Sequence, residues 1–309
     1  MRNLSIDWLK FFLAICVIFL HLDIFRTRIP ELGFILCNGL FRTAVPIFLI
    51  ITGYYFVNVN NIQQLKTWIA RIGVLYLIWM LIYSPIWLKS SSNILFTVVT
   101  GYHHLWYLVS SIFAGIILFV CRNLSFPKLF ISAVSLFIIG STIQFIGKLH
   151  ILNHNVDLIF NELSSYRNFL FLCFPFLTIG FLINKFNVEK YFKPQFYLII
   201  LSILLLIFES YLYFKYVDSN EGFDFLFSLI ATCPLIFLYV KNLKIQGSSK
   251  NIATIATGIY LVHPYIIELS QYLTRQEVGY HFGQAGVLCL TALTTALLVL
   301  LNKKIKFLL

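Results

Sequence analysis

The amino-acid sequence predicts an all-α membrane protein of about ten transmembrane helices. Hydrophobic residues make up 60% of the 309 positions, charged residues only 11%, and the mean hydropathy is +0.87. Apolar runs of about 20 residues recur along the chain, which is the length that crosses a bilayer core roughly 30 Å thick as a helix. A soluble domain of this length would be far more polar, so the composition indicates a polytopic membrane protein.

The expected helices are joined by short polar connections. We find no Gly-rich phosphate loop, internal repeat or low-complexity tract, and the longest polar stretches, 147–167 and 273–283, have the size of loops. We therefore expect a single membrane-embedded domain over residues 1–309. The ten predicted spans are residues 6–24, 36–57, 69–88, 104–121, 128–146, 168–184, 196–214, 223–240, 252–272 and 284–301.

The charges of the connecting loops predict the orientation of the helices. Lys and Arg gather in the loops on the side of the amino terminus, whereas the opposite loops carry acidic residues among fewer bases. The positive-inside rule then places both termini in the cytoplasm. The net charge of +11 mostly follows from this topology, so it does not indicate a nucleic-acid partner.

The first predicted helix carries Asp7, Lys10 and His21 within an apolar run from Ile6 to Leu22. At about 100° per residue, the step from Lys10 to His21 is three turns plus only roughly 20°, so both side chains project from one face. Asp7 lies one turn below Lys10. Ionisable groups inside a bilayer usually face a bundle interior or a cavity and mark function. The structural alternative is a Lys10 side chain that extends to the interface beside a tolerated His21.

Two further segments combine polar and aromatic side chains. In residues 45–54, Pro46 frees a backbone carbonyl and Thr52-Gly53 permits close helix approach, so helix packing is the favoured interpretation. In residues 102–107, adjacent histidines precede Trp106 and Tyr107. An interfacial aromatic belt explains the aromatic residues but does not require the histidines, so a functional role is equally well supported.

The ninth predicted span contains Tyr260 and His263, which lie three residues apart and hence on one helix face. Pro264 loosens the helix next to them. An intramembrane histidine aligned with a tyrosine favours a functional role. The alternative is a structural pair whose hydrogen bonds are satisfied. Glu209, in the seventh span, has two interpretations, a carboxylate inside a cavity or one near the interface.

Metal and hydrolase chemistry are not predicted. His103 and His104 diverge by about 100° on a helix, and no His or Cys cluster has metal-ligand spacing. The Gly-x-Ser-x-Gly motif of serine hydrolases is absent from the sequence. The six cysteines form no Cys-x-x-Cys pair and are expected to be small packing residues.

Taken in order, these motifs resemble those of the integral-membrane acyltransferase-3 family, which includes bacterial O-acetyltransferases of surface glycans such as the enterobacterial common antigen. The resemblance runs from Asp7 to about Pro264, and the ten-span topology agrees with it. The matching motifs are Asp7-x-x-Lys10-x10-His21, Val45-Pro46-x-Phe48-x-x-x-Thr52-Gly53-Tyr54, His104-Leu105-Trp106-Tyr107 and Gly258-Ile259-Tyr260-x-x-His263.

The resemblance implies transfer of an acetyl group from cytosolic acetyl-CoA to a hydroxyl of a surface or lipid-linked glycan, in a multi-pass protein of the bacterial cell membrane. It assigns catalysis to the first-helix histidine, here His21. The family commonly has Arg where this chain has Lys10, and Ser where it has Thr52; Lys lacks the bidentate fork of Arg. The family often has a basic pair after the second span, which is represented here only by Lys66 and Arg71. We expect these two residues to bind CoA together with Lys10.

The chemistry of the residues is compatible with acyl transfer, which needs a base for the attacking hydroxyl and donors for the oxyanion. His21 lies about 16 Å along the helix from Lys10, in the outer half of the membrane, where it can serve as general base or as nucleophile. Asp7 is a second catalytic candidate. The expected supporting or substrate-binding residues are Thr52, His104, Trp106, Tyr107, Tyr260 and His263.

Two other classes of function are compatible with parts of the sequence. The polar stripe of the first helix also suits a transporter of a small solute or lipid-linked sugar, but the repeated halves with broken helices of many transporters are missing. A non-catalytic scaffold does not explain the clustered Asp, Lys, His and Tyr. Cleavage of acetyl-CoA separates the enzyme from both.

Overall fold

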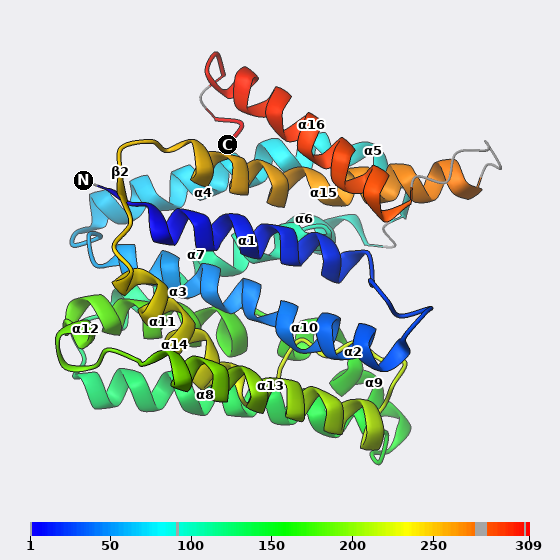
Figure 1. Cartoon of the computed structure of the whole chain (residues 1–309), viewed down its shortest axis with the longest axis horizontal. Coiled ribbons are helices and arrows are strands. Elements are labelled where there is room, and N and C mark those ends of the chain that lie inside the picture. Colours follow the sequence, from blue (N-terminus) through cyan, green and yellow to red (C-terminus); the bar gives the residue numbers. More distant parts are fainter. Residues whose placement is uncertain (1, 91–92, 276–282, 306) are drawn as a thin grey trace.

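The structure, a computed structural model, describes residues 2–90, 93–275, 283–305 and 307–309 (Figure 1). Within these ranges the chain is almost entirely helical, and eight helical stretches are long and apolar enough to cross a membrane. Two of the predicted spans correspond to shorter apolar helices, Phe169–Lys185 and Leu229–Asn242. The all-α membrane fold is therefore confirmed, while the count of ten spans and their orientation stay predictions. The predicted loop 273–283 lies mostly outside the described residues.

Helices α1 to α16 follow the chain with two short 3₁₀ turns, one π turn and one two-stranded pairing. Asparagine side chains cap several of these helices, for example Asn61 before α4 and Asn153 before α9, by accepting a backbone N–H two or three residues on. The helices are α1 (Leu4–His21), α2 (Pro30–Asn38), α3 (Ala44–Phe56), α4 (Ile62–Ile82), α5 (Ser84–Ser90), α6 (Ile94–Thr100), α7 (Trp106–Cys121), α8 (Phe126–Lys148), α9 (His154–Asn161), α10 (Leu163–Tyr166), α11 (Phe174–Lys185), α12 (Val188–Tyr191), α13 (Phe196–Tyr216), α14 (Leu229–Asn242), α15 (Asn251–Arg275) and α16 (Gln284–Asn302).

Helix α1 lies in the middle of the bundle, beside α15 on one side and α3 on the other (Figure 1). At its amino-terminal end, strand β1 (Arg2–Asn3) pairs antiparallel with β2 (Gln246–Gly247), which precedes α15. The Asn3 side chain also donates to the carbonyl of Lys241, at 2.8 Å. These contacts anchor the start of α1, so His21 is held at the opposite end of the bundle.

Helices α3 and α11 pack with their backbones in contact. A Cβ atom added at Gly53 of α3 would overlap the carbonyl of Leu177, and one at Gly180 of α11 would overlap the carbonyl of Ile50. Small residues allow this approach, which favours helix association where water is absent. The predicted packing role of Gly53 is confirmed.

The second predicted span is interrupted near its amino-terminal end. Helix α2 ends before Gly39, a 3₁₀ turn covers Leu40–Thr43, and α3 begins at Ala44. The turn carries Arg42, whose Nε donates to the carbonyl of Cys37 at 3.1 Å. The break in the helix therefore positions a guanidinium group at the same end of the bundle as His21.

The connection between α13 and α14 is held by polar side chains of neighbouring helices. Gln144 of α8 donates to the carbonyl of Phe225 at 2.8 Å and accepts from the N–H of Asp224 at 2.7 Å. Glu209 of α13 accepts from the backbone N–H groups of Phe227 and Ser228, at 2.6 and 2.8 Å. Glu209 therefore anchors the start of α14, a structural role that neither of its two sequence interpretations included.

Candidate active site

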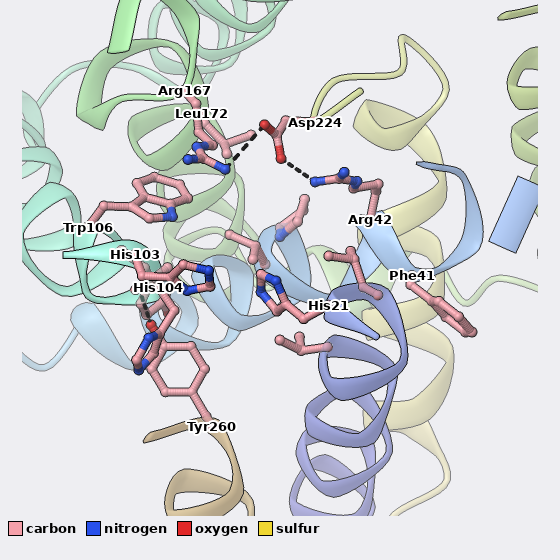
Figure 2. A pocket seen from close by; sticks show the side chains of 15 residues that line it. His21, Phe41, Arg42, His103, His104, Trp106, Arg167, Leu172, Asp224 and Tyr260 are labelled. Carbon is pink, nitrogen blue, oxygen red and sulfur yellow. Dashed lines mark hydrogen bonds and ion pairs between the residues drawn. The ribbon is translucent and has the colours of Figure 1, made fainter. Parts of the chain in front are cut away.

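A cavity of about 110 Å³ surrounds His21, the last residue of α1 (Figure 2). It collects side chains from α1, the 3₁₀ turn before α3, the start of α7 and α15, so residues far apart in sequence meet here. Four of the predicted site residues besides His21 line it, namely His104, Trp106, Tyr107 and Tyr260. Residues that the sequence analysis did not select also line it, namely Arg42, Arg167 and Asp224.

Four histidine rings lie close together at this cavity. The ring centroid of His21 is 4.9 Å from that of His103 and 5.3 Å from that of His263, and His104 and His263 are 5.6 Å apart. The 3₁₀ turn His103–Leu105 before α7 sets this arrangement, and His103 adopts a positive φ of 46°. Among the described residues, no group of three or more His, Cys, Asp or Glu is arranged to hold a metal ion.

Two of these histidines are buried with ring nitrogens that lack a hydrogen-bond partner. His263 is fully buried, and its Nδ1 lies 3.1 Å from the carbonyl of Ile259, which can only accept, so Nδ1 carries the proton. Its Nε2 has no partner, and neither nitrogen of His104 has one. Unsatisfied polar atoms are costly in a packed interior and often mark functional sites. The arrangement thus leaves hydrogen-bonding capacity available beside His21.

Tyr260, one turn before Pro264 in α15, forms part of the cavity wall. The Tyr260 hydroxyl donates to the backbone carbonyl of His104 at 2.6 Å. One turn further on, the hydroxyl of buried Tyr83 donates to the carbonyl of Leu261 at 2.9 Å and accepts from the N–H of Tyr265 at 3.1 Å. This inserted hydroxyl satisfies backbone groups next to the proline, as membrane helices with proline require.

A second cavity, of about 200 Å³, adjoins the first on the side of Lys10, and we call it the inner cavity. Val45, Tyr107 and Tyr260 line both cavities, so these side chains form the wall between them. The inner cavity also contains two hydroxyl groups, those of Thr52 and Thr257. Lys10 and His21 therefore line two adjoining cavities.

Asp224 joins two arginines above His21 (Figure 2). It forms ion pairs with Arg42 and with Arg167, the latter at 3.4 Å. Burial opposes ionisation of Asp224, but the guanidinium groups of Arg42 and Arg167 lower the pKa of its carboxyl below the usual value. No sequence spacing pointed to this cluster, because its members come from three separate connections and meet only in the folded chain.

Three predicted site residues lie apart from His21. Asp7 is buried near the start of α1, and fourteen residues of helix place it roughly 21 Å along the axis from His21. The distance excludes direct contact between Asp7 and His21, and the catalytic role of Asp7 stays a prediction. Lys66 and Arg71 lie on exposed parts of α4 and line neither the His21 cavity nor the inner cavity.

Comparison with known proteins identifies the class of this membrane protein. The family model described as an acyltransferase domain matches residues 3–303, so the chain belongs to the acyltransferase-3 family. The family match and the helical architecture together define a multi-pass membrane acyltransferase. No solved structure matches the chain with significant similarity.

Two curated relatives come from enterococci. An "amino-acid racemase" of Enterococcus faecalis is 27% identical over 301 residues, which cover 89% of this chain and 42% of the relative. A "serine/alanine racemase" of Enterococcus gallinarum is 26% identical over 303 residues, with the same coverage of 89% and 42%. The chain thus spans less than half the length of these relatives, and their names describe longer proteins.

Proposed function

We propose that this protein transfers an acetyl group from cytosolic acetyl-CoA to a hydroxyl of a surface or lipid-linked glycan on the outer side of a bacterial cell membrane. The single observation that carries the proposal is the pair of adjoining cavities, with Lys10 in one and His21 in the other. Such a pair offers a donor and an acceptor separate approaches to one histidine. The proposal includes ten spans with both termini in the cytoplasm.

His21 acts in this proposal as the general base. It takes the proton of the acceptor hydroxyl, whose oxygen attacks the thioester carbonyl carbon; the carbon–sulfur bond breaks, and the CoA thiolate receives the proton from His21. We assign the hydrogen bond to the oxyanion to the Tyr107 hydroxyl, because Tyr107 lines both cavities. His263 supports the imidazole of His21 through their ring contact, and His104 in turn contacts the ring of His263.

The donor approaches from the cytosolic side. Lys10 lines the inner cavity, where the acetyl-pantetheine arm enters and its ammonium group attracts the phosphates. Lys66 and Arg71, exposed on α4, are proposed to bind the CoA phosphates that stay outside the cavity. Other cytosolic-side bases have structural partners: Arg122 donates to the carbonyl of Val59 at 2.8 Å, and Lys241 pairs with Glu189.

Purified protein in lipid nanodiscs with radiolabelled acetyl-CoA tests the proposal. We expect thioester cleavage that depends on His21 and accelerates when a glycan acceptor is added. Free L-serine is tested as an acceptor in parallel, because a relative is named for serine and serine carries a hydroxyl. A labelled His21 adduct would show that the histidine is a nucleophile instead of a base.

The alternative is a transporter of a small solute or lipid-linked sugar. It predicts solute movement across proteoliposomes with acetyl-CoA left intact. Intact acetyl-CoA in every acceptor mixture would reject the proposed acetyl transfer.

A further inference from the structure

A third hollow, which we call the lateral groove, opens beside the His21 cavity. It has a volume of about 590 Å³ and lies between α6, the outer part of α7 and the connection from α10 to the π turn Phe169–Cys173. His103, Trp106 and Arg167 line both the groove and the His21 cavity. The groove therefore adjoins the candidate active site, and it shares no lining residue with the inner cavity.

The walls of the lateral groove are largely apolar and exposed. Phe96 and Val99 of α6, Phe113 of α7 and Phe169 of the π turn line it, with exposed fractions between 37% and 54%. Helix α6 contributes no buried residue, so its apolar side chains have little packing role within the described chain. In a membrane-spanning protein, exposed apolar side chains of this kind face lipid tails, so the groove walls match an acyl chain better than a sugar.

The end of the groove next to the His21 cavity carries positive charge. Arg167 lies over the ring of Trp106, with its guanidinium carbon 5.3 Å from the ring centroid. Its ion pair with Asp224 is long, at 3.4 Å, and Arg42 pairs with the same carboxylate. Two guanidinium groups thus share one carboxylate, which leaves Arg167 with donors for a further anion. Glu162, the acidic residue of the groove lining, is exposed and lies 3.5 Å from the Ser164 hydroxyl.

The local structure fixes Arg167 at this junction. Arg167 ends α10 with an N–H donated to the carbonyl of Leu163 at 2.8 Å. The next residue, Asn168, accepts from the N–H groups of Leu170 and Phe171 at 2.9 and 3.0 Å and so caps the π turn. The backbone of Arg167 is therefore fixed on both sides, and its guanidinium is positioned by Asp224 and the Trp106 ring.

We propose that the lateral groove binds the acyl acceptor and that this acceptor is an anionic amphiphile. Its apolar tail lies along Phe96, Phe113 and Phe169, and its anionic head pairs with Arg167. The head thereby brings a neighbouring hydroxyl toward His21, while the donor enters from the inner cavity. This assignment of the acceptor class rests on the proposed acyltransferase function. It adds that the acceptor reaches the His21 cavity from the lipid side of the bundle.

Binding of radiolabelled decyl phosphate to the protein in phosphatidylcholine nanodiscs tests the groove without any acyl transfer. Wild-type protein should bind it saturably, and Arg167→Gln should weaken binding by about tenfold or more, the usual size of a lost charge-assisted hydrogen bond. Arg167→Lys should retain part of the affinity. Decanol and inorganic phosphate, which each lack one half of the probe, should bind at least about tenfold more weakly than decyl phosphate.

Two further variants make the result decisive. Phe113→Asp leaves the ion pairs of Asp224 with Arg42 and Arg167 intact and should also weaken decyl phosphate binding. It therefore tests the groove even if Arg167→Gln fails to fold. Arg28→Gln, at an exposed arginine outside the three cavities, should bind like wild type. Unchanged binding in Phe113→Asp and in a folded Arg167→Gln, or equally tight inorganic phosphate, would overturn the proposal. This binding assay contains no acetyl-CoA, so its result does not depend on acyl transfer. A failure of the proposed acyltransferase function would be detected separately, in the acetyl-CoA cleavage assay.

Discussion

The contact between α3 and α11 and the His21 cavity lie in the same bundle but are built in opposite ways. At the first, Gly53 and Gly180 bring two backbones together among apolar side chains, with no room for even a Cβ atom. At the second, buried histidine nitrogens lack partners and two arginines share one carboxylate. Close packing stabilises the bundle, whereas the cavity leaves polar groups free for a ligand, so substitutions should separate stability from activity.

The largest expected effect is at His21. His21→Ala should lower acyl transfer by about 10² to 10⁴ fold, the usual contribution of a general base, with the protein still folded and acetyl-CoA still bound. His21→Gln keeps much of the volume and should be nearly as inactive. Turnover and thermal unfolding are measured together, with His154→Gln at an exposed histidine as the control. Near-normal transfer by folded His21→Gln would remove the assigned mechanism.

The next effect is on stability at the helix contact. Gly53→Ala places a methyl group against the Leu177 carbonyl and should cost about 3 kcal/mol of unfolding free energy, because the clash is with backbone. Gly73→Ala is the matched control, since a Cβ there meets nothing within 4 Å and alanine favours the helix. Thermal unfolding in nanodiscs should show a large loss for the first variant and a small gain for the second. Equal melting temperatures would contradict the backbone contact.

A smaller effect is expected at Asp224, which belongs to the cavity but also ties three connections together. Asp224→Asn removes the charge that compensates Arg42 and Arg167 and should cost about 2 kcal/mol. Because the native pKa of Asp224 is lowered, its contribution is complete above the unfolded pKa of about 3.9 and is lost as pH falls through the lower native value. Wild-type melting temperatures should therefore fall more steeply than those of Asp224→Asn below about pH 4. Parallel pH curves would show that the ion pairs add no stability.

The smallest effect is expected at the donor end. Lys10→Ala should weaken acetyl-CoA binding by about tenfold and leave thermal stability nearly unchanged, while Lys10→Arg should retain most of the affinity. Arg71→Ala tests whether an exposed base of α4 also contributes to binding the phosphates. Isothermal titration measures the acetyl-CoA affinity of the Lys10 and Arg71 variants at two salt concentrations. Salt should weaken the contribution of exposed Arg71 more than that of Lys10, because exposed charges are screened more strongly than buried ones. Wild-type affinity in Lys10→Ala would exclude Lys10 from the donor site.

Glu209 and Asp7 show where sequence reasoning about single residues stops. Both are acidic residues in apolar helices; the sequence suggested catalysis for Asp7 and left Glu209 between a cavity and the interface. In the folded chain Glu209 accepts backbone N–H groups at the start of α14, and Asp7 lies at the far end of α1 from His21. The partners of a buried carboxylate come from other helices, so its role depends on tertiary contacts that no local pattern contains.

The sequence by itself determined the membrane class, the helical composition and the helix face shared by Lys10 and His21, because hydrophobic length and helical periodicity are local properties. It also indicated the close approach at Gly53. Only the tertiary structure decided that His21 meets His103 and His263, and that Asp224 joins Arg42 to Arg167. Those contacts link residues up to about 240 positions apart, and which of them form depends on how the helices pack as a bundle.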